Sequence, residues 1–144
     1  MKKRIRILAF VLVMICVAAT LCACGDDQNQ DYVYFQNDTG VKVVGVYISS
    51  VTADTWGDPL NLATVSVGAK IHFDPAKALP DGPGTTYDVG VLDEKDMVYE
   101  IYEVTLNLND VISVRGDGED AILTVTDAQG GVTEYYGWIY PFEE

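Results

Sequence analysis

Short segments rich in β-branched and aromatic residues recur along the chain, and turns containing Gly, Asp or Asn separate them. No stretch after the N-terminal region keeps a helical apolar period for more than a turn or two. Segments of this kind, bounded by turn residues, predict strands joined by short connections. The pattern therefore predicts an all-β domain, an antiparallel two-sheet β-sandwich of about seven to nine strands.

The strands are expected at residues 31–36, 41–49, 62–73 (in two pieces), 86–92, 97–104, 111–115, 121–127 and 132–140. The second segment has apolar residues on both faces, which is typical of a central strand. We expect it to pair with the first across the turn Asn37-Asp38-Thr39-Gly40. Residues 74–85 are rich in Pro and Gly and predict the longest and most mobile loop.

The first 23 residues have the three parts of an export signal. A basic start (Lys2, Lys3, Arg4 and Arg6) precedes an uncharged, mostly apolar run over residues 7–21. This run is shorter than the roughly 20 residues that a membrane-spanning helix needs. It ends in Leu21-Cys22-Ala23-Cys24, where the small Ala23 stands before Cys24. Cys22 would instead follow the bulky Leu21, and Cys16 lies inside the apolar run.

This arrangement resembles the lipobox of bacterial lipoproteins, with Leu21 three positions before Cys24 and Ala23 directly before it. The resemblance implies removal of residues 1–23, a diacyl or triacyl lipid on Cys24, a polar tether over residues 24–30 and a domain over residues 31–144. One acyl chain holds a protein only weakly, so a durable anchor takes more than one. The implied location is extracytoplasmic, at the membrane or envelope. The alternative is an ordinary signal peptide with an incidental cysteine.

All 22 acidic residues follow Cys24, against five basic ones, so the chain without its signal has a net charge of −17. Such a chain repels phosphate backbones, and we expect no nucleic-acid partner. It also repels anionic headgroups, so the lipid is expected to provide the membrane contact. Cys24 is the last cysteine, which leaves the domain without a disulfide or a free thiol.

Four aromatic residues near the C-terminus are spaced by two and would share one face of a strand. They are Tyr136, Trp138, Tyr140 and Phe142. Exposed, this row would offer a stacking surface to a sugar or a partner protein. Large apolar side chains are usually buried, however, and packing of the row into the core is the favoured interpretation.

The acidic turn Asp117-Gly118-Glu119-Asp120 is a weak calcium candidate, because its spacing lacks the EF-hand pattern and a solvated hairpin turn explains it as well. Arg115-Gly116-Asp117 spells the tripeptide that integrins recognise, and we interpret it as a chance match at a hairpin tip. His72, the single histidine, cannot form a zinc site of the usual kind. We expect no resident cofactor beyond the lipid.

A set of motifs also lies in the predicted strands and turns of the domain. It comprises Asn37-Asp38-Thr39-Gly40, Val46-Tyr47-Ile48-Ser49, Trp56-Gly57, Gly68, Tyr87-Asp88-Val89 and Asp93. With these motifs the span from Asp31 to Val114 resembles uncharacterised secreted bacterial β-sandwich domains. The resemblance implies a sandwich and no known activity, so no functional residues are carried over.

No nucleotide-binding glycine motif and no nucleophile elbow occurs in the sequence, which favours a protein without catalytic activity. The predicted function is that of a lipid-anchored binding or accessory module for a protein or a glycan. Two alternatives stay open. One is a small envelope hydrolase that uses paired carboxylates, and the other is a purely structural envelope component.

Overall fold

The computed structural model describes residues 31–143, so the predicted signal (1–23), the lipidation position Cys24 and the tether lie outside the described residues. One eight-stranded sheet makes up most of this part, in the order β2-β4-β5-β8-β7-β6-β1-β3. The elements are β1 (Val33–Asn37), β2 (Val43–Ser50), β3 (Lys70–Phe73), α1 (Pro75–Ala78), β4 (Thr85–Asp93), β5 (Met97–Leu106), β6 (Val111–Asp117), β7 (Asp120–Thr126) and β8 (Val132–Pro141).

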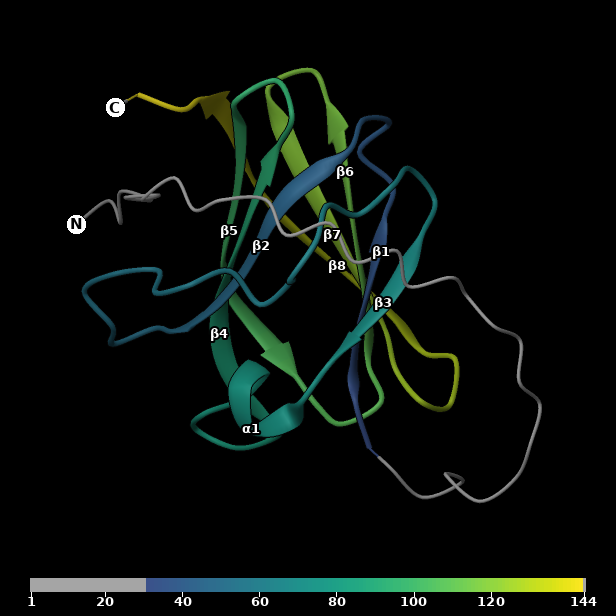
Figure 1. The fold of residues 1–144 in the computed structure, drawn as a ribbon. Helices are drawn as coiled ribbons and strands as arrows, with labels where there is room; N and C mark the ends of the chain where they lie inside the picture. The colour runs from purple at the N-terminus through teal and green to yellow at the C-terminus, as the bar shows by residue number, and fades with distance from the viewer. Residues whose placement is uncertain (1–30, 144) are drawn as a thin grey trace.

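The prediction of a mainly β domain is confirmed, but the predicted two-sheet sandwich is wrong. The eight strands form a single sheet that curls strongly into a half-barrel (Figure 1). The sheet stays continuous because β5 pairs with β4 along one side and with β8 along the other. The sheet is also mixed, since β1 and β6 run parallel while the other neighbours are antiparallel.

The predicted hairpin of the first two strands is likewise wrong. β1 pairs with β3 and β6, whereas β2 stands at the opposite edge of the sheet. The curl nevertheless brings the start of β2 near the end of β1, and the segment 65–69 bonds to both. Val65 forms a two-way bridge with Val43, and the backbone of Asn37 exchanges hydrogen bonds with Gly68 and Ala69. The side chain of Asn37 donates a further hydrogen bond to the Val65 carbonyl. This fully buried amide therefore helps to join the end of β1 to the segment 65–69, which in turn bonds to the start of β2.

β2 is an edge strand, and a loop covers its open side. The Leu60 N–H bonds to the Val46 carbonyl, and the Asn61 side chain takes the place of a neighbouring strand. Its Oδ1 accepts from the Val46 N–H at 2.7 Å, and its Nδ2 donates to the Val44 carbonyl at 3.1 Å. An uncovered edge is a template for pairing with another chain, so this loop protects the fold against aggregation.

Residues 62–67 do not form the extra strand that their apolar character predicts. Of the range 62–73, only Lys70–Phe73 is a strand.

The loop predicted over 74–85 is also more ordered than expected. Asp74 caps the short helix α1 by accepting from the Ala76 N–H, and the buried Tyr87 hydroxyl bonds to the backbone at Asp81 and Gly82. No helix within residues 31–143 has the length and apolar character needed to cross a bilayer.

The inner face of the curled sheet carries the main core. Its largest fully buried side chains include Phe35, Tyr87, Ile101, Ile112 and Leu123, which come from five different strands. Complete burial of such side chains contributes roughly 1.5–3 kcal/mol each. The cluster extends over both halves of the sheet, so the curl and the core depend on each other.

A second, smaller cluster lies on the outer face. It consists of Tyr47, Trp56, Leu92 and Val98. Tyr47, Leu92 and Val98 are sequence neighbours of main-core residues, and successive strand residues point to opposite faces. Trp56 reaches this cluster from the loop after β2 and is 4% exposed. Trp56 therefore packs against the outer face of the sheet.

At Gly137 the backbones of β5 and β8 lie close together. A Cβ at this position would lie 1.9 Å from the backbone oxygen of Glu100 and 2.8 Å from its carbonyl carbon. Neither atom can turn aside as a side chain would. At Gly116, by contrast, the closest obstacle is the tip of the Ile139 side chain. Position 137 therefore admits only glycine without a shift of the backbone.

We predict that Gly137→Ala lowers the free energy of unfolding by about 3 kcal/mol, because the added methyl must push two strands apart. Gly116→Ala is the matched control and should cost less than about 1 kcal/mol, since Ile139 can change rotamer. Urea unfolding of both variants measures the difference. Equal stabilities of the two variants would show that the close approach does not constrain the sheet.

Candidate functional site

The C-terminal aromatic row lies on the outer face of β8. Tyr135 and Ile139 pack against the main core, so the alternate residues Tyr136, Trp138 and Tyr140 point outward. Tyr136 is 66% exposed and Trp138 is 59% exposed. The favoured interpretation, in which this row packs into the core, is therefore wrong for these two rings.

The other two members of the row are half-buried. Tyr140 and Phe142 pack against the second cluster on the outer face. The Phe142 N–H also bonds to the Asp96 carbonyl, which holds the end of the chain beside the β4–β5 turn. The row thus has a fixed end, formed by Tyr140 and Phe142, and an exposed end, formed by Tyr136 and Trp138.

Two further rings extend the row across β5. The ring centroids of Tyr102 and Trp138 are 6.0 Å apart, and those of Tyr102 and Trp56 are 6.4 Å apart. Distances in this range are typical of interacting aromatic pairs. We use the name aromatic face for Tyr102, Tyr136, Trp138 and Tyr140, which share the outer surface of β5 and β8. A shallow pocket of about 240 Å³ lies beside it, lined by Thr55, Trp56, Gly57 and Asp58.

A buried carboxylate lies beneath the aromatic face. Glu100 of β5 stands directly opposite Trp138 of β8 and is only 3% exposed. Its Oε2 accepts a hydrogen bond of 2.7 Å from the Tyr102 hydroxyl, and the Tyr140 hydroxyl also bonds to this carboxylate. Within residues 31–143, its Oε1 has no hydrogen-bond partner. Leaving a buried acceptor unsatisfied costs about 1–3 kcal/mol, so Glu100 is an unusual feature of the fold.

The other buried carboxylates of the described chain have structural roles. Asp93 accepts from the backbone of Lys95 and Met97 and so closes the β4–β5 turn. Asp88 accepts from the Glu103 N–H, and Asp110 accepts from the Asn107 N–H. Each of these acids satisfies a backbone donor at a turn or an irregular part of a strand.

Glu100 is a residue of the candidate site that the sequence pattern did not reveal. The sequence feature that could have indicated it is a single acid between Val98 and Tyr102, on one face of an otherwise apolar strand. Such an acid is ordinarily a solvent-facing residue of a half-buried strand. Only the position of the aromatic row above it, which brings the Tyr140 hydroxyl to its carboxylate, reveals that Glu100 is buried.

Glu100 changes the acidity of the tyrosines around it. Burial raises the pKa of Tyr102 and of Tyr140 well above the usual value, and the hydrogen bond to the Glu100 carboxylate raises each pKa further. For Tyr102, the charge of Asp88 acts in the same direction. Both hydroxyls therefore stay protonated and remain donors to Glu100 over the physiological range.

On the far side of Trp138, β7 contributes the exposed Asp120, whose Cα also stands opposite that of Trp138. Residues directly opposite one another on neighbouring strands share a face. The Trp138 ring is therefore flanked by a carboxylate on each neighbouring strand, Glu100 and Asp120. The strand register alone produces this arrangement.

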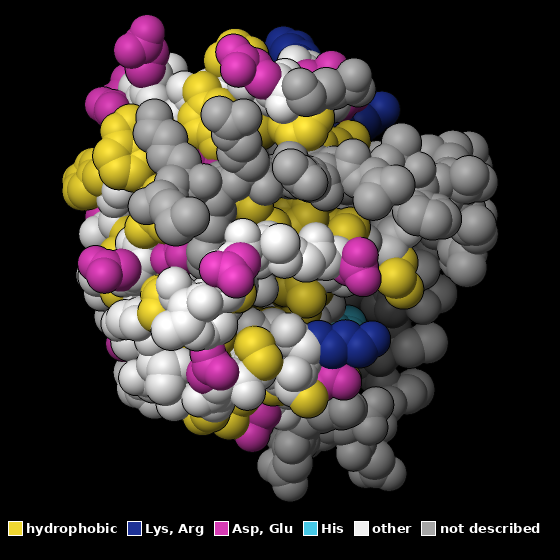
Figure 2. Space-filling view, turned by 90° about the vertical axis from the view of Figure 1, so that its left-hand side faces the viewer, with side chains coloured by type: hydrophobic (Ala, Val, Ile, Leu, Met, Phe, Trp, Pro, Cys, Tyr) yellow, Lys and Arg dark blue, Asp and Glu magenta, His cyan; other side chains and the backbone are white. Residues whose placement is uncertain are grey.

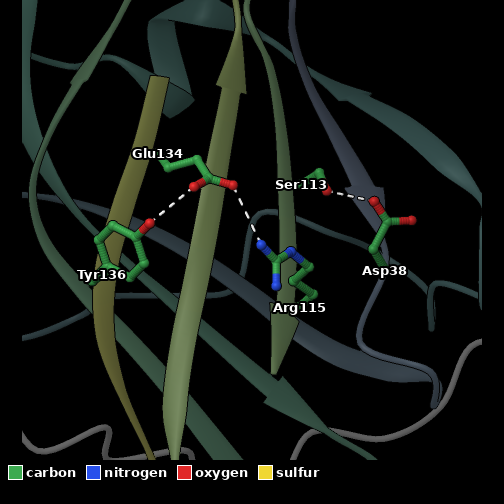
Figure 3. A network of polar contacts seen from close by, with 5 residues as sticks. All are labelled: Asp38, Ser113, Arg115, Glu134 and Tyr136. Carbon is green, nitrogen blue, oxygen red and sulfur yellow. Dashed lines mark hydrogen bonds and ion pairs between the residues drawn. The ribbon is translucent and has the colours of Figure 1, made fainter. Parts of the chain in front are cut away.

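A polar network continues the outer face toward β6 (Figure 3). The Arg115 guanidinium pairs with Glu134 at 3.3 Å, and the Tyr136 hydroxyl donates to the same carboxylate at 2.9 Å. Ser113 donates to Asp38 beside them. The strand register places the buried Ile122 opposite both Arg115 and Tyr136. The charge of Arg115 is therefore already paired within the chain.

Three further features singled out in the sequence do not form binding sites in the described structure: the Arg-Gly-Asp tripeptide, the acidic turn and His72. Arg115-Gly116-Asp117 lies within β6 and not at a hairpin tip, because Gly118 and Glu119 form the turn between Asp117 and Asp120. In the described part of the chain no three His, Cys, Asp or Glu side chains are grouped to hold a metal ion, so Asp117, Glu119 and Asp120 are not assembled as a calcium site. The exposed His72 ring lies 4.3 Å from the Tyr32 ring.

Comparison of the chain with protein-family models, with curated proteins and with solved structures finds no match. The resemblances to bacterial lipoproteins and to secreted β-sandwich domains therefore stay predictions from sequence. The candidate site consists of two exposed rings, Tyr136 and Trp138, with the buried Glu100 and the exposed Asp120 directly opposite Trp138 on the two neighbouring strands.

We predict that Glu100→Gln lowers the pKa of both Tyr102 and Tyr140, because the variant removes the negative charge that opposes ionisation of the two hydroxyls. A ¹³C NMR titration of ring-labelled tyrosine, followed at Cζ, measures each pKa separately. Tyr99 is the internal control: burial and the neighbouring Asp93 raise its pKa to about 12, and the variant should leave it unchanged. Unaltered titration of Tyr102 and Tyr140 would contradict the assigned role of Glu100.

Proposed function

We propose that this protein is a lipid-anchored, extracytoplasmic binding module and that its aromatic face is the binding site. The observation that carries the proposal is the exposure of Tyr136 and Trp138, at 66% and 59%, on a surface otherwise built from packed rings and paired polar groups. Aromatic rings are enriched where proteins bind their partners, because each supplies a large rigid contact area.

The anchor rests on the N-terminal sequence. A basic start, a short apolar run and Leu21-Cys22-Ala23-Cys24 support export, cleavage before Cys24 and lipidation of that cysteine. The acidic domain, with five basic against nineteen acidic residues over 31–143, favours attachment through lipid over attachment through a protein surface. The anchor would keep the binding face outside the cytoplasm without inserting the domain into the bilayer.

The geometry gives less support to a hydrolase with paired carboxylates. Such an enzyme needs two carboxylates facing one substrate. Asp88, Asp93 and Asp110 are buried and bond to backbone donors, and the pocket beside Trp56 contains one acid, Asp58. Glu100 is buried, bonds to the Tyr102 hydroxyl, and is separated from Asp120 by the intervening strand β8. The exposed rings instead favour non-catalytic binding of a protein or a glycan.

For the anchor, we predict that Cys24→Ser abolishes incorporation of an alkyne-bearing palmitate supplied to bacteria expressing the full chain. The variant should also leave the membrane fraction, since acyl chains supply the attachment. Cys22→Ser is the matched control and should be labelled like the unaltered chain. Labelling that persists in Cys24→Ser, or that is lost in Cys22→Ser, would contradict the assignment of Cys24.

For the binding face, we predict that the full chain in detergent micelles binds members of an array of glycans and peptides, and that Trp138→Ala weakens this binding by at least about tenfold, as at other interface hot spots. Leu62→Ala is the control, because Leu62 is 98% exposed in the loop that covers β2. It should bind as the unaltered chain does. Binding that Trp138→Ala leaves unchanged would exclude the aromatic face as the site.

A further inference from the structure

We infer that the partner of the aromatic face is a basic protein segment, and that a Lys or Arg side chain of the partner lies on Trp138 between Glu100 and Asp120. The inference rests on the proposed function and specifies its ligand. It follows from the strand register, from the unsatisfied oxygen of Glu100 and from the charge of the surrounding surface.

The register places Trp138 between two carboxylates. Glu100 on β5 and Asp120 on β7 are both its direct cross-strand neighbours. The face of an indole ring attracts a cation through its quadrupole, and Trp is the strongest of the aromatic side chains in this respect. A cation over this ring would also be attracted by carboxylates on both sides. The same arrangement would repel an acidic ligand.

Glu100 supplies the second, independent observation. Its side chain is buried, its Oε2 is bonded to Tyr102, and its Oε1 lacks a donor within the described residues. Trp138 stands directly opposite Glu100 and is 59% exposed, so a ligand that lies on the indole ring also comes beside this carboxylate. A guanidinium or ammonium N–H would form the strongest type of hydrogen bond to the Glu100 Oε1, because both the donor and the acceptor would be charged.

The surrounding charge favours a basic partner over a neutral one. Residues 31–143 carry five basic and nineteen acidic side chains, and Arg115, which borders the aromatic face, is already paired with Glu134. Figure 2 views the molecule from the side where β4 and β5 lie in Figure 1, and it shows hydrophobic side chains at the surface with Asp and Glu among them. The negative electrostatic potential of such a surface speeds the encounter with a basic protein and suppresses the binding of acidic proteins.

The test uses the full chain in micelles of a non-ionic detergent and a probe peptide of alternating Gly and Arg, with a Gln-for-Arg peptide as its counterpart. Quenching or shift of tryptophan fluorescence and calorimetry measure binding. We expect the Arg peptide to bind and the Gln peptide not to bind. Trp138→Ala, Glu100→Gln and Asp120→Asn should each weaken binding of the Arg peptide by at least about tenfold.

Asp81→Asn is the matched control, because Asp81 is an exposed acid in the loop after α1 and its removal changes the net charge equally. It should retain the binding. Should Glu100→Gln unfold, as thermal melting would reveal, the exposed Asp120 still provides the test. Equal losses in Asp81→Asn and Asp120→Asn would overturn the inference, because they would indicate attraction by net charge alone.

Two results separate this inference from the proposed function. Binding of array glycans that Trp138→Ala abolishes, together with no difference between the Arg and Gln peptides, would overturn the basic partner and leave the aromatic face as the binding site. No effect of Trp138→Ala on any ligand would overturn both.

Discussion

The structure depends on the close approach of β8 to β5 at Gly137, where a Cβ would collide with the backbone of Glu100. The two strands pair between Met97–Glu100 and Trp138–Pro141, and the regular pairing ends at Glu100–Trp138. Beyond this point, the Tyr135 hydroxyl accepts from the Thr105 N–H and links the two strands again. The pairing places Glu100 and Trp138 directly opposite each other on the outer face of the curled sheet.

The two faces of the curled sheet differ in the share of Tyr and Trp among their apolar residues. The inner face takes mostly aliphatic side chains, which pack densely and need no hydrogen-bond partner. The outer face takes Tyr and Trp, which have polar atoms that must be satisfied. The Tyr102 and Tyr140 hydroxyls both use Glu100 for this purpose. The carboxylate thus organises the aromatic face from below, and its second oxygen has no hydrogen-bond partner within residues 31–143.

The sequence was sufficient to predict the strands and the alternation within them, because β-branched residues and turn formers recur at short intervals. It could not predict the topology, since β2 carries apolar residues on both faces like a central strand while the side chain of Asn61 covers its edge. It also placed the aromatic row in the core. Alternation reveals that Tyr136 and Trp138 share a face, but not which face. The backbone of β5 lies against Gly137, so this position admits no side chain, and its neighbours Tyr136 and Trp138 point to the outer face.

The proposed binding site depends on the exposure of Trp138 on a face that the fold does not fill, whereas Trp56 is buried. Quenching of fluorescence by acrylamide tests it directly, because the chain has only these two tryptophans. Trp56→Phe, which leaves Trp138, should emit like tryptophan in water and be quenched strongly. Trp138→Phe, which leaves Trp56, should emit at shorter wavelength and be protected. Protection of Trp138 in a folded Trp56→Phe variant would contradict the account.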